Sequence, residues 1–325
     1  MRFTYLATFL SGTATIVEKS FKTLIPDVEI QTVLDGGIIF NTAENFQNLT
    51  SLGFVNNVFV VIKEYSLSVK ATFPSMVKWC ETHDLNYLNA FTKKLGFTNF
   101  RIRFISTNTF VSYNDTAISN IARKLSKELN ITVNRLNPDT ELWFMQRGEG
   151  YSYVLLRLTN NLQVEHRLKG QLRHELANLM CLLSEPNDSD IFLDPFAGYG
   201  TIIEERQKFR AKQILGFEKD LSINGLVPVE KADFFNSTIK DSSITKIVTD
   251  PPWGLFDKSL DINEFYNLMF RKFDRILAEK SILVLLVNRD TDIQPFLKSL
   301  PFAVSESYDI LVSGKKATIY KIVRG

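Results

Sequence analysis

Two short stretches of this chain carry residue types that could do chemistry on two substrates held side by side. Residues 194–201 read Asp-Pro-Phe-Ala-Gly-Tyr-Gly-Thr, and residues 250–253, which begin 49 positions after Thr201, read Asp-Pro-Pro-Trp. Each stretch follows a short apolar run, at 191–193 and at 247–249, that is typical of a buried parallel strand. Because ligands of open α/β sheets bind outside the carboxyl ends of the strands, we expect both motifs to face one crevice.

The first motif is a glycine-rich turn from strand to helix. Gly198 and Gly200 lack Cβ atoms, so the backbone can adopt unusual φ values and let a ligand approach closely. A dinucleotide fingerprint would need a third glycine where Ile203 stands, and no Gly-Lys-Ser/Thr follows to grip a phosphate. A nicotinamide or ATP site is therefore disfavoured, and a plain tight turn is the alternative reading.

A second strand, predicted over 213–218, also ends in a carboxylate. In this fold class such an acid often hydrogen-bonds ribose hydroxyls, which makes Glu218 the candidate for that role and Asp220 its reserve. The alternative is that one of these two acids only caps the helix that follows.

The second motif suits an amino group as nucleophile. The amino lone pair of a nucleobase is delocalised into its ring, so the amine attacks poorly unless acceptors hold its N–H groups. Asp250 and the carbonyl of Pro251 can be those acceptors, and the two prolines restrict φ and stiffen the pair. Trp253 offers an aromatic face on which an extruded base can stack. The alternative is an ordinary proline-rich turn with a core tryptophan.

Together the two motifs resemble those of the class I S-adenosylmethionine-dependent methyltransferases, and more narrowly those of the THUMP-domain RNA guanine-N2 methyltransferases. That family typically shows Asp-Pro-Phe-Cys-Gly-Ser-Gly-Thr and Thr-Asp-Pro-Pro-Tyr-Gly. The departures here are Ala197 for Cys, Tyr199 for Ser and Trp253 for Tyr, and none removes a carboxylate or a glycine. The resemblance covers nearly the whole chain and implies S-adenosylmethionine as cofactor, with S-adenosylhomocysteine as product.

The resemblance also implies roles for particular residues. The donor site would be formed by Asp194, Phe196, Gly198, Gly200, Thr201, Glu218, Asp233 and Phe234. The target guanine would be received, without a metal, by Asp250, Pro251, Pro252 and Trp253. Only twelve residues separate Asp220 from Asp233, where the family usually fits a helix and another strand. This shortening predicts an abbreviated or open adenine pocket, and it leaves a catalytically silent RNA-binding protein as an alternative.

The rest of the carboxyl half continues the same sheet. Apolar residues spaced for one helical face predict a helix over 263–277, and we expect that face, with Phe265 and Leu268 on it, to be core. The elements expected after it are a buried strand at 281–288, a short helix at 293–300, and a terminal hairpin of strands at 302–312 and 316–324.

The amino half has a different organisation. Its predicted elements are a strand at 3–10, a helix at 13–24, a hairpin of strands at 28–33 and 38–41 around Asp35-Gly36-Gly37, a short helix near 43–52 and a strand at 58–62. This β-α-β-β-α-β order suggests a ferredoxin-like unit.

The following stretch, residues 66–160, resembles a THUMP module, a module that is associated with grasping RNA. Its predicted elements are helices between 73 and 95, a strand at 100–106, a helix ending at Leu129, and strands at 142–145 and 153–158. The candidate phosphate contacts are Lys93, Lys94, Arg101, Arg103, Arg123, Lys124 and Lys127, with Arg173 at the junction to the methyltransferase part. For each of these cations the alternative is a solvated surface side chain.

The predicted fold class is α/β, with a C-terminal Rossmann-like class I methyltransferase sheet and N-terminal α+β ferredoxin-like and THUMP-like modules. A chain of 325 residues with 45% hydrophobic composition has enough apolar material for these cores. The predicted limits are 1–65 for the ferredoxin-like domain, 66–160 for the THUMP-like domain, 161–170 for a linker and 171–325 for the methyltransferase domain.

Composition narrows the class of protein further. The net charge is only +2, so RNA binding would depend on local patches and shape, which favours a folded RNA. Cys80 and Cys181 lack metal-ligand spacing, which argues against a disulfide scaffold and a cysteine zinc site. No apolar run approaches the roughly 20 residues that span a bilayer, and we expect a cytoplasmic location.

The leading hypothesis is an RNA methyltransferase that acts on the exocyclic N2 amine of guanosine. The THUMP-like front half makes tRNA the expected RNA. Alternatives are ribosomal RNA guanine, or the N6 amine of adenine, because Asp-Pro-Pro-aromatic also occurs in adenine-N6 methyltransferases. A protein partner is left open.

Overall fold

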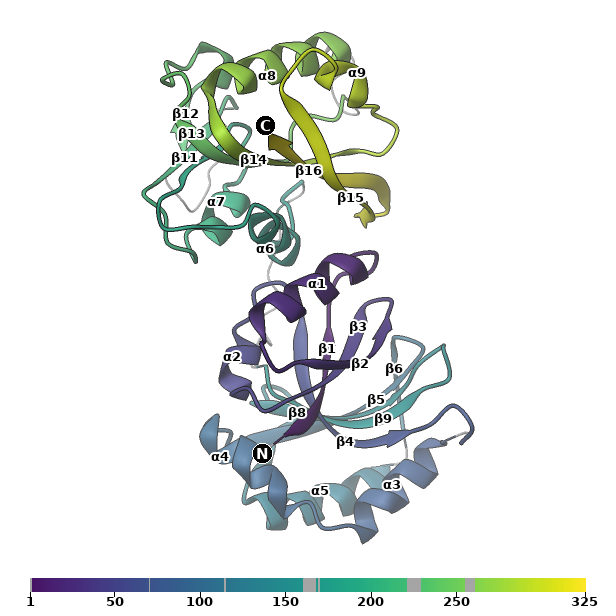
Figure 1. Ribbon diagram of the computed structural model, residues 1–325. Helices are drawn as coiled ribbons and strands as arrows, with labels where there is room; N and C mark the ends of the chain where they lie inside the picture. The colour runs from purple at the N-terminus through teal and green to yellow at the C-terminus, as the bar shows by residue number, and fades with distance from the viewer. Residues whose placement is uncertain are drawn as a thin grey trace. The chain divides into compact units, whose positions relative to one another are not determined.

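A computed structural model describes residues 2–69, 71–113, 115–159, 168, 170–220, 229–254 and 261–325 (Figure 1). The chain divides into two compact units. The first comprises Met1–Thr8 with Ile25–Glu165, and the second comprises Phe9–Leu24 with His166–Gly325.

The first 65 residues follow the predicted β-α-β-β-α-β order along the chain, although the first helix groups with unit two. The elements in unit one are β1 (Phe3–Thr8), β2 (Glu29–Leu34), β3 (Gly37–Thr42), α2 (Phe46–Thr50) and β4 (Asn57–Tyr65). The strands pair antiparallel in the order β2-β3-β1-β4. Gly36, at φ 75°, makes the tight turn between β2 and β3 that the Asp-Gly-Gly sequence predicted.

The second half of unit one, which is predicted to be THUMP-like, extends the same sheet. Its elements are α3 (Phe73–Thr82), η1 (Asn86–Leu88), α4 (Asn89–Lys94), β5 (Asn99–Ser106), β6 (Thr109–Val111), α5 (Asp115–Leu129), β7 (Thr132–Val133), β8 (Thr140–Gln146) and β9 (Ser152–Arg157). Strand β4 pairs with β9, and the sheet continues through β8 and β5 to β6, with β7 beside β5. The predicted limit between residues 65 and 66 therefore falls inside one continuous sheet.

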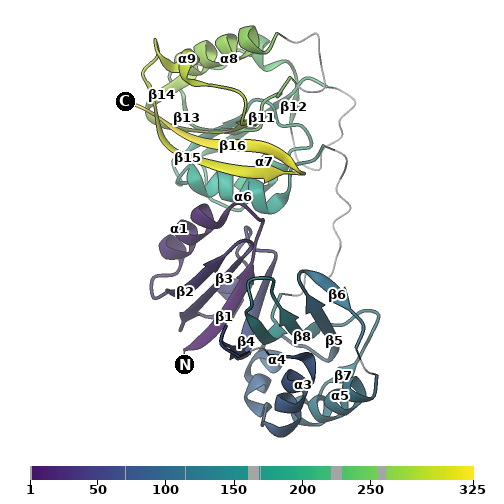
Figure 2. The same cartoon turned by 90° about the vertical axis from the view of Figure 1, so that its right-hand side faces the viewer.

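Helices cover one face of this part of the sheet. Strands β5 and β8 run parallel, so the chain must cross over between them, and α5 lies on that crossover. Figure 1 shows α3 and α5 on the same face, and the turned view in Figure 2 agrees. The buried residues Ile121, Leu125 and Leu129, spaced four apart, form the inner side of α5.

Unit two contains a seven-stranded sheet in the order β12-β11-β10-β13-β14-β16-β15 among the described residues. Its strands are β10 (Ile191–Asp194), β11 (Gln213–Glu218), β12 (Glu230–Lys231), β13 (Ile244–Thr249), β14 (Leu277–Asn288), β15 (Phe302–Val312) and β16 (Lys315–Arg324). The first five are parallel, and β16 pairs antiparallel with both β14 and β15. Figure 2 shows the β15–β16 hairpin at one end of this sheet.

Helices lie on both faces of the unit-two sheet. They are α1 (Ala14–Leu24), α6 (His174–Leu183), α7 (Thr201–Arg206), α8 (Ile262–Ile276) and α9 (Gln294–Leu297), with the short η2 at Phe234–Asn236. In Figure 1, α6 and α7 lie on one face and α8 and α9 on the other. The predicted α/β fold class, with its Rossmann-like sheet, is confirmed.

Two sequence-based boundaries in this sheet are wrong. The helix predicted to reach residue 277 ends at Ile276, and β14 begins at Leu277 rather than at residue 281. Lys280, at φ 56°, interrupts the pairing with β13, so the register shifts before Ile282. Such a bulge breaks the apolar pattern that would have revealed the start of the strand.

Helix α1 belongs to a different unit from the strands that flank it in the sequence. It falls within the first 65 residues, yet it groups with the second unit. There the ammonium of Lys19 lies 2.6 Å from Oε1 of Glu306 on β15. The chain thus returns to unit one only at Ile25.

Candidate active site

The two chemical motifs end neighbouring parallel strands. Strand β10 pairs with β13, with Leu193 opposite Ile247, so residues 194–201 and 250–253 leave the sheet at the same edge. The acid-bearing end of β11 lies on the other side of β10, with Asp194 opposite Gly216. The crevice expected from the sequence therefore has a structural basis.

A cleft of about 880 Å³ opens beside these strand ends, a volume in the range of small-molecule sites. Of the predicted site residues, it is lined by Phe196, Glu218, Asp233, Phe234 and Pro252, together with the reserve candidate Asp220. Pro195, which belongs to the first motif, also lines it, as do residues for which the sequence predicts no such place: Lys219, Phe235, Asp261, Glu264, Phe265 and Leu268.

Phe265 and Leu268 correct one expectation. The helical spacing of the sequence predicts both as core residues of the helix α8. Leu268 is 50% exposed, Phe265 is only partly buried, and both line the cleft. The core side of α8 is instead formed by Tyr266, Met269, Phe270, Phe273 and Ile276.

The glycine turn leaves open space beside the backbone. Gly198 has φ 53° and Gly200 φ 83°, both in the left-handed region that favours glycine. A Cβ atom built on Gly198 meets nothing within 4 Å among the described residues. Gly200 precedes α7, whose first residue, Thr201, is buried and receives a 3.4 Å hydrogen bond from the side-chain amide of Gln171. A ligand can therefore approach the backbone at Gly198.

Glu218 fixes this turn from the neighbouring strand. Its Oε2 accepts the N–H of Gly198 at 2.7 Å, and its Oε1 accepts the N–H of Asp220 at 2.7 Å. Each carboxylate oxygen keeps capacity for a further hydrogen bond. The predicted ribose contact through Glu218 is therefore sterically and chemically open.

Asp194 lies behind the turn instead of on the cleft. Its side chain is fully buried, and Oδ1 accepts the N–H of Phe196 at 3.3 Å. Its Oδ2 is buried without a hydrogen-bond partner among the described residues. Burial raises the pKa of Asp194 to about 7. The geometry gives this carboxyl a role in shaping the turn.

The turn around Asp233, where the resemblance implies an adenine contact, is held by several hydrogen bonds and an ion pair. Asp233 caps η2 by accepting the N–H of Phe235 at 2.9 Å, and the ammonium of Lys219 lies 3.2 Å from its Oδ2. From α8, Lys272 donates to the carbonyls of Phe234 and Phe235, the latter at 3.0 Å. The Phe234 ring is buried and packs edge-on against Phe196, with ring centroids 5.7 Å apart.

The short segment before this turn still contains a strand. Glu230–Lys231 form β12, which pairs with β11 through Glu218 and Lys231. The short spacing between Asp220 and Asp233 predicts that this strand is missing, but it is present with two residues. Residues 221–228, on which the predicted openness of the adenine pocket also depends, lie outside the described residues.

The Asp-Pro-Pro-Trp motif has an internal hydrogen bond. The indole N–H of Trp253 donates to Oδ1 of Asp250 at 2.8 Å. Burial raises the pKa of Asp250 to about 7, and the hydrogen bond from Trp253 acts in the opposite direction. Pro251 is buried, whereas Pro252 is exposed on the cleft, and the Tyr266 hydroxyl lies 3.5 Å from the Pro252 carbonyl. Trp253 is half-buried, so its indole N–H can donate to Asp250 while part of its ring stays accessible.

The predicted RNA contacts divide into two groups. Arg101 and Arg103 on β5 and Arg123 on α5 line a second cavity, in unit one. The remaining candidates do not line that cavity, and they are Lys93 and Lys94 at the end of α4, Lys124 and Lys127 on α5, and Arg173 before α6. Two of these have acidic partners, because Lys124 lies 2.9 Å from Glu128 and Arg173 lies 3.0 Å from Glu175.

Other classes of site have no support in the described part of the chain. No group of three or more His, Cys, Asp or Glu side chains there could hold a metal ion. Cys80 and Cys181 are buried free thiols. None of the helices in the described ranges has the length and apolar character needed to cross a membrane.

The class I methyltransferase fold is defined by a parallel sheet with helices on both faces and an antiparallel hairpin at one end. It also has a glycine-rich turn after the first strand and an acidic residue at the end of the second. Solved structures bear this out. The chain is similar to TrmN from Thermus thermophilus, with a TM-score of 0.69 and 15% identity over 99% of this chain and 100% of that one. It is also similar to SMU.472 complexed with S-adenosylhomocysteine, with a TM-score of 0.63 and 16% identity over 98% and 97% of the two chains.

One curated relative is more specific. The U6 snRNA (guanine-N(2))-methyltransferase THUMPD2 of Mus musculus is 25% identical to this chain over 189 residues, which cover 52% of this chain and 34% of that protein. The match thus spans about a third of that relative's length. No protein-family model matches the chain. The resemblance to THUMP-type class I RNA methyltransferases is confirmed, and S-adenosylmethionine is supported as the cofactor.

The residues present fit that cofactor. The backbone at Gly198 faces open space, the Glu218 carboxylate lines the cleft beside it, and Asp233 and Phe234 lie farther along the same cleft. An extended ligand with a ribose between two other groups suits this arrangement of a turn, an acid and an aromatic wall.

Proposed function

We propose that this chain methylates the exocyclic N2 amine of guanosine in RNA, using S-adenosylmethionine. The observation that carries the proposal is the position of Asp250. Its carboxylate is held by Trp253 at the end of β13, next to the strand that ends in the glycine turn. The name of the mouse relative, which acts on a guanine N2 in RNA, supports the choice of target atom.

The chain's own residues would bind and orient the two reactants. Gly198 and Glu218 would hold the central part of the donor, and Asp233 with Phe234 its adenine. Pro252 and the exposed face of Trp253 would bind the base, as flat apolar surfaces suit an extruded purine. The presence of Glu218, Asp233, Phe234 and Pro252 on one cleft supports these roles.

Asp250 would act on the amine itself. Among the described residues, the hydrogen bond from Trp253 goes to Oδ1, so Oδ2 can accept one amine N–H, and the Pro251 carbonyl can accept the other. These two acceptors return electron density to the nitrogen. The bound cofactor supplies an electrophilic methyl group on its sulfonium sulfur, and the displaced amine proton passes to the carboxylate. Alignment and hydrogen bonding would provide most of the rate enhancement.

We expect tRNA as a substrate because the front half of the chain is THUMP-like. U6 snRNA is the second expected substrate, because the mouse relative is named as acting on it. The test is methyl transfer from isotopically labelled S-adenosylmethionine to unmodified total tRNA and to a U6 snRNA transcript, followed by nucleoside mass spectrometry. N2-methylguanosine is the expected product. Labelled N6-methyladenosine in its place would contradict the assignment of the target amine.

Asp250→Asn is the variant that tests the site, since it keeps the shape of the side chain and still offers Trp253 an oxygen acceptor. We expect turnover to fall by about 100-fold or more, because the acceptor of the amine proton is lost. Affinity for S-adenosylmethionine, measured by isothermal titration, should stay within about twofold. Equal turnover in the variant and the parent would refute the site. Folded parent chain that binds no S-adenosylmethionine would favour the silent RNA-binding alternative.

A further inference from the structure

The cleft beside the strand ends has one cation among the lining residues that the structure describes, Lys219. This lysine follows Glu218, the last residue of β11. Its ammonium lies 3.2 Å from Oδ2 of Asp233, which precedes η2 in the turn after β12. Lys219 therefore links two parts of the cleft wall that come from neighbouring strands.

The carboxylates of this cleft differ in how their oxygens are engaged. Glu218 accepts two backbone N–H groups, and Asp261 caps α8 by accepting two others. Asp233 uses Oδ1 for the N–H of Phe235, while its Oδ2 faces the ammonium of Lys219. Oδ2 of Asp233 and the ammonium of Lys219 thus form an acceptor and a donor side by side on the cleft.

The ion pair between Lys219 and Asp233 can take up a third group. The side chain of Lys219 is 79% exposed and that of Asp233 is 24% exposed. Exposed ion pairs contribute little because water competes for both partners. A carboxylate oxygen can accept a second hydrogen bond, and an ammonium has three donors. A ligand can therefore bind to both groups while Oδ1 keeps its hydrogen bond within the turn.

An apolar surface adjoins this polar pair. The rings of Phe196, Phe235 and Phe265 are partly buried, line the same cleft and contact one another, with centroids 5.3, 5.5 and 6.1 Å apart. Phe235 follows Asp233 by only two positions. Such rings suit a flat heterocyclic base whose polar edge meets a few placed polar groups.

The edge of adenine matches the polar pair. Its exocyclic amino group donates, and the ring nitrogens on either side of that group, N1 and N7, accept. We propose that Lys219 binds the adenine of the methyl donor: its ammonium donates to N1 or N7, while Asp233 accepts the amino group between them. This inference rests on the proposed function for the placement of the donor adenine beside Asp233 and Phe234.

The experiment measures ligand binding by the full chain and needs no RNA. Isothermal titration gives the Kd of S-adenosylhomocysteine and of its 1-deaza and 7-deaza analogues. Lys219→Met keeps an unbranched side chain and removes the ammonium, and Lys240→Met is the matched change at an exposed lysine outside the cleft. We expect Lys219→Met to raise the Kd of S-adenosylhomocysteine about tenfold, and Lys240→Met to change it less than twofold.

The deaza analogues identify the contact atom. In the parent, one of them should bind about tenfold more weakly than S-adenosylhomocysteine, whereas in Lys219→Met the same analogue should bind within about twofold of it. Lys219→Arg keeps a charged donor and should recover part of the lost affinity. A loss in Lys219→Met that is equal for all three ligands would overturn the contact, because damage to the turn has no preference for one ring nitrogen.

A comparison with S-adenosylmethionine separates this contact from the charge of the cleft. Five carboxylates are among its described lining residues, so the loss of a cation makes the cleft more negative. S-adenosylmethionine carries one more positive charge than S-adenosylhomocysteine, and a more negative cleft attracts it more strongly. Both ligands should nevertheless lose affinity in Lys219→Met. Tighter binding of S-adenosylmethionine by this variant would overturn the contact.

The result is independent of catalysis. Lys219-dependent ligand binding without any methylated RNA would support the contact and count against the proposed function. Methylated RNA together with unchanged ligand affinity in Lys219→Met would support the proposed function and overturn the contact.

Discussion

The hydrogen bond between Trp253 and Asp250 gives a prediction about pH dependence. Trp253→Phe removes the indole N–H that donates to Oδ1 at 2.8 Å and keeps an aromatic ring at the same position. A hydrogen bond to a charged group contributes about 1.5–3 kcal/mol, and about 1.4 kcal/mol corresponds to 1 in pKa. Since the bond favours the ionised carboxyl, its loss should raise the pKa of Asp250 by about 1.

The starting value makes this change visible near neutral pH. Burial raises the pKa of Asp250 to about 7, so about half of the parent molecules carry the carboxylate at pH 7. After a rise of about 1, only about a tenth would be ionised, and methyl transfer at pH 7 should fall about fivefold. Because the carboxylate is the active form, activity increases with pH, and the loss should disappear near pH 9.

The assay is the pH profile of kcat/KM for methyl transfer in the parent and in Trp253→Phe. Of the described ionisable groups, Asp194 and Tyr266 also interact electrostatically with Asp250, so Tyr266→Phe serves as a control for a neighbouring change. The indole N–H resonance of Trp253 should titrate with the same midpoint in the parent and lose that titration in Asp250→Asn. A loss of activity in Trp253→Phe that is equal at every pH would refute the reasoning and leave Trp253 a stacking role only.

Three further predictions concern the donor side of the cleft. Burial raises the pKa of Asp194 to about 7, so between about pH 4 and 7 the folded state keeps a proton that the unfolded state has released. The free energy of unfolding that this group contributes therefore falls as the pH rises. At pH 8, urea unfolding should show Asp194→Asn to be more stable than the parent by on the order of 2 kcal/mol. Gly198→Ala forces a side chain into the left-handed region at about 1 kcal/mol and fills the space beside the turn, so calorimetry should show a larger loss of S-adenosylmethionine affinity than of thermal stability. Lys272→Met releases the carbonyls of Phe234 and Phe235, which should raise the Kd for S-adenosylmethionine about tenfold while kcat at saturating cofactor changes little.

Much of the fold followed from local patterns in the sequence. Alternating and helical periodicities located the main strands and helices, and the Asp-Gly-Gly turn located the β2–β3 hairpin. A two-residue strand such as Glu230–Lys231 has no period to detect, and the bulge at Lys280 hid the start of β14. Irregular backbone was thus the limit of the pattern-based approach.

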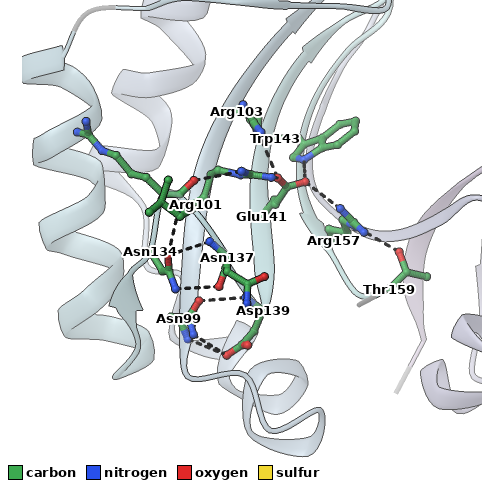
Figure 3. Close-up of polar contacts among 12 residues, drawn as sticks. Asn99, Arg101, Arg103, Asn134, Asn137, Asp139, Glu141, Trp143, Arg157 and Thr159 are labelled. Atoms are coloured by element: carbon green, nitrogen blue, oxygen red, sulfur yellow. Dashed lines mark hydrogen bonds and ion pairs between the residues drawn. The ribbon is translucent and has the colours of Figure 1, made fainter. Parts of the chain in front are cut away.

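The candidate site shows a different limit. The strand-end motifs predicted that Glu218 and Asp250 leave the sheet at the same edge, because parallel strands bring their carboxyl ends together. Helical periodicity assigned Leu268 to the core, although a broad apolar face can also border a cleft. The cluster of Arg101, Arg103 and Arg157 on Glu141 (Figure 3) depends on strand pairing across dozens of residues, and no local signal reports such pairing.

The pairing of β4 with β9 has a consequence for how the first unit must fold. Strand β4 is complete at Tyr65, but the strand that covers its far edge begins at Ser152. During synthesis the first four strands would therefore emerge with an open hydrogen-bonding edge, as would any fragment cut after residue 65. Lys63 and Glu64 lie on that edge, and charged side chains there discourage pairing with another chain until β9 arrives.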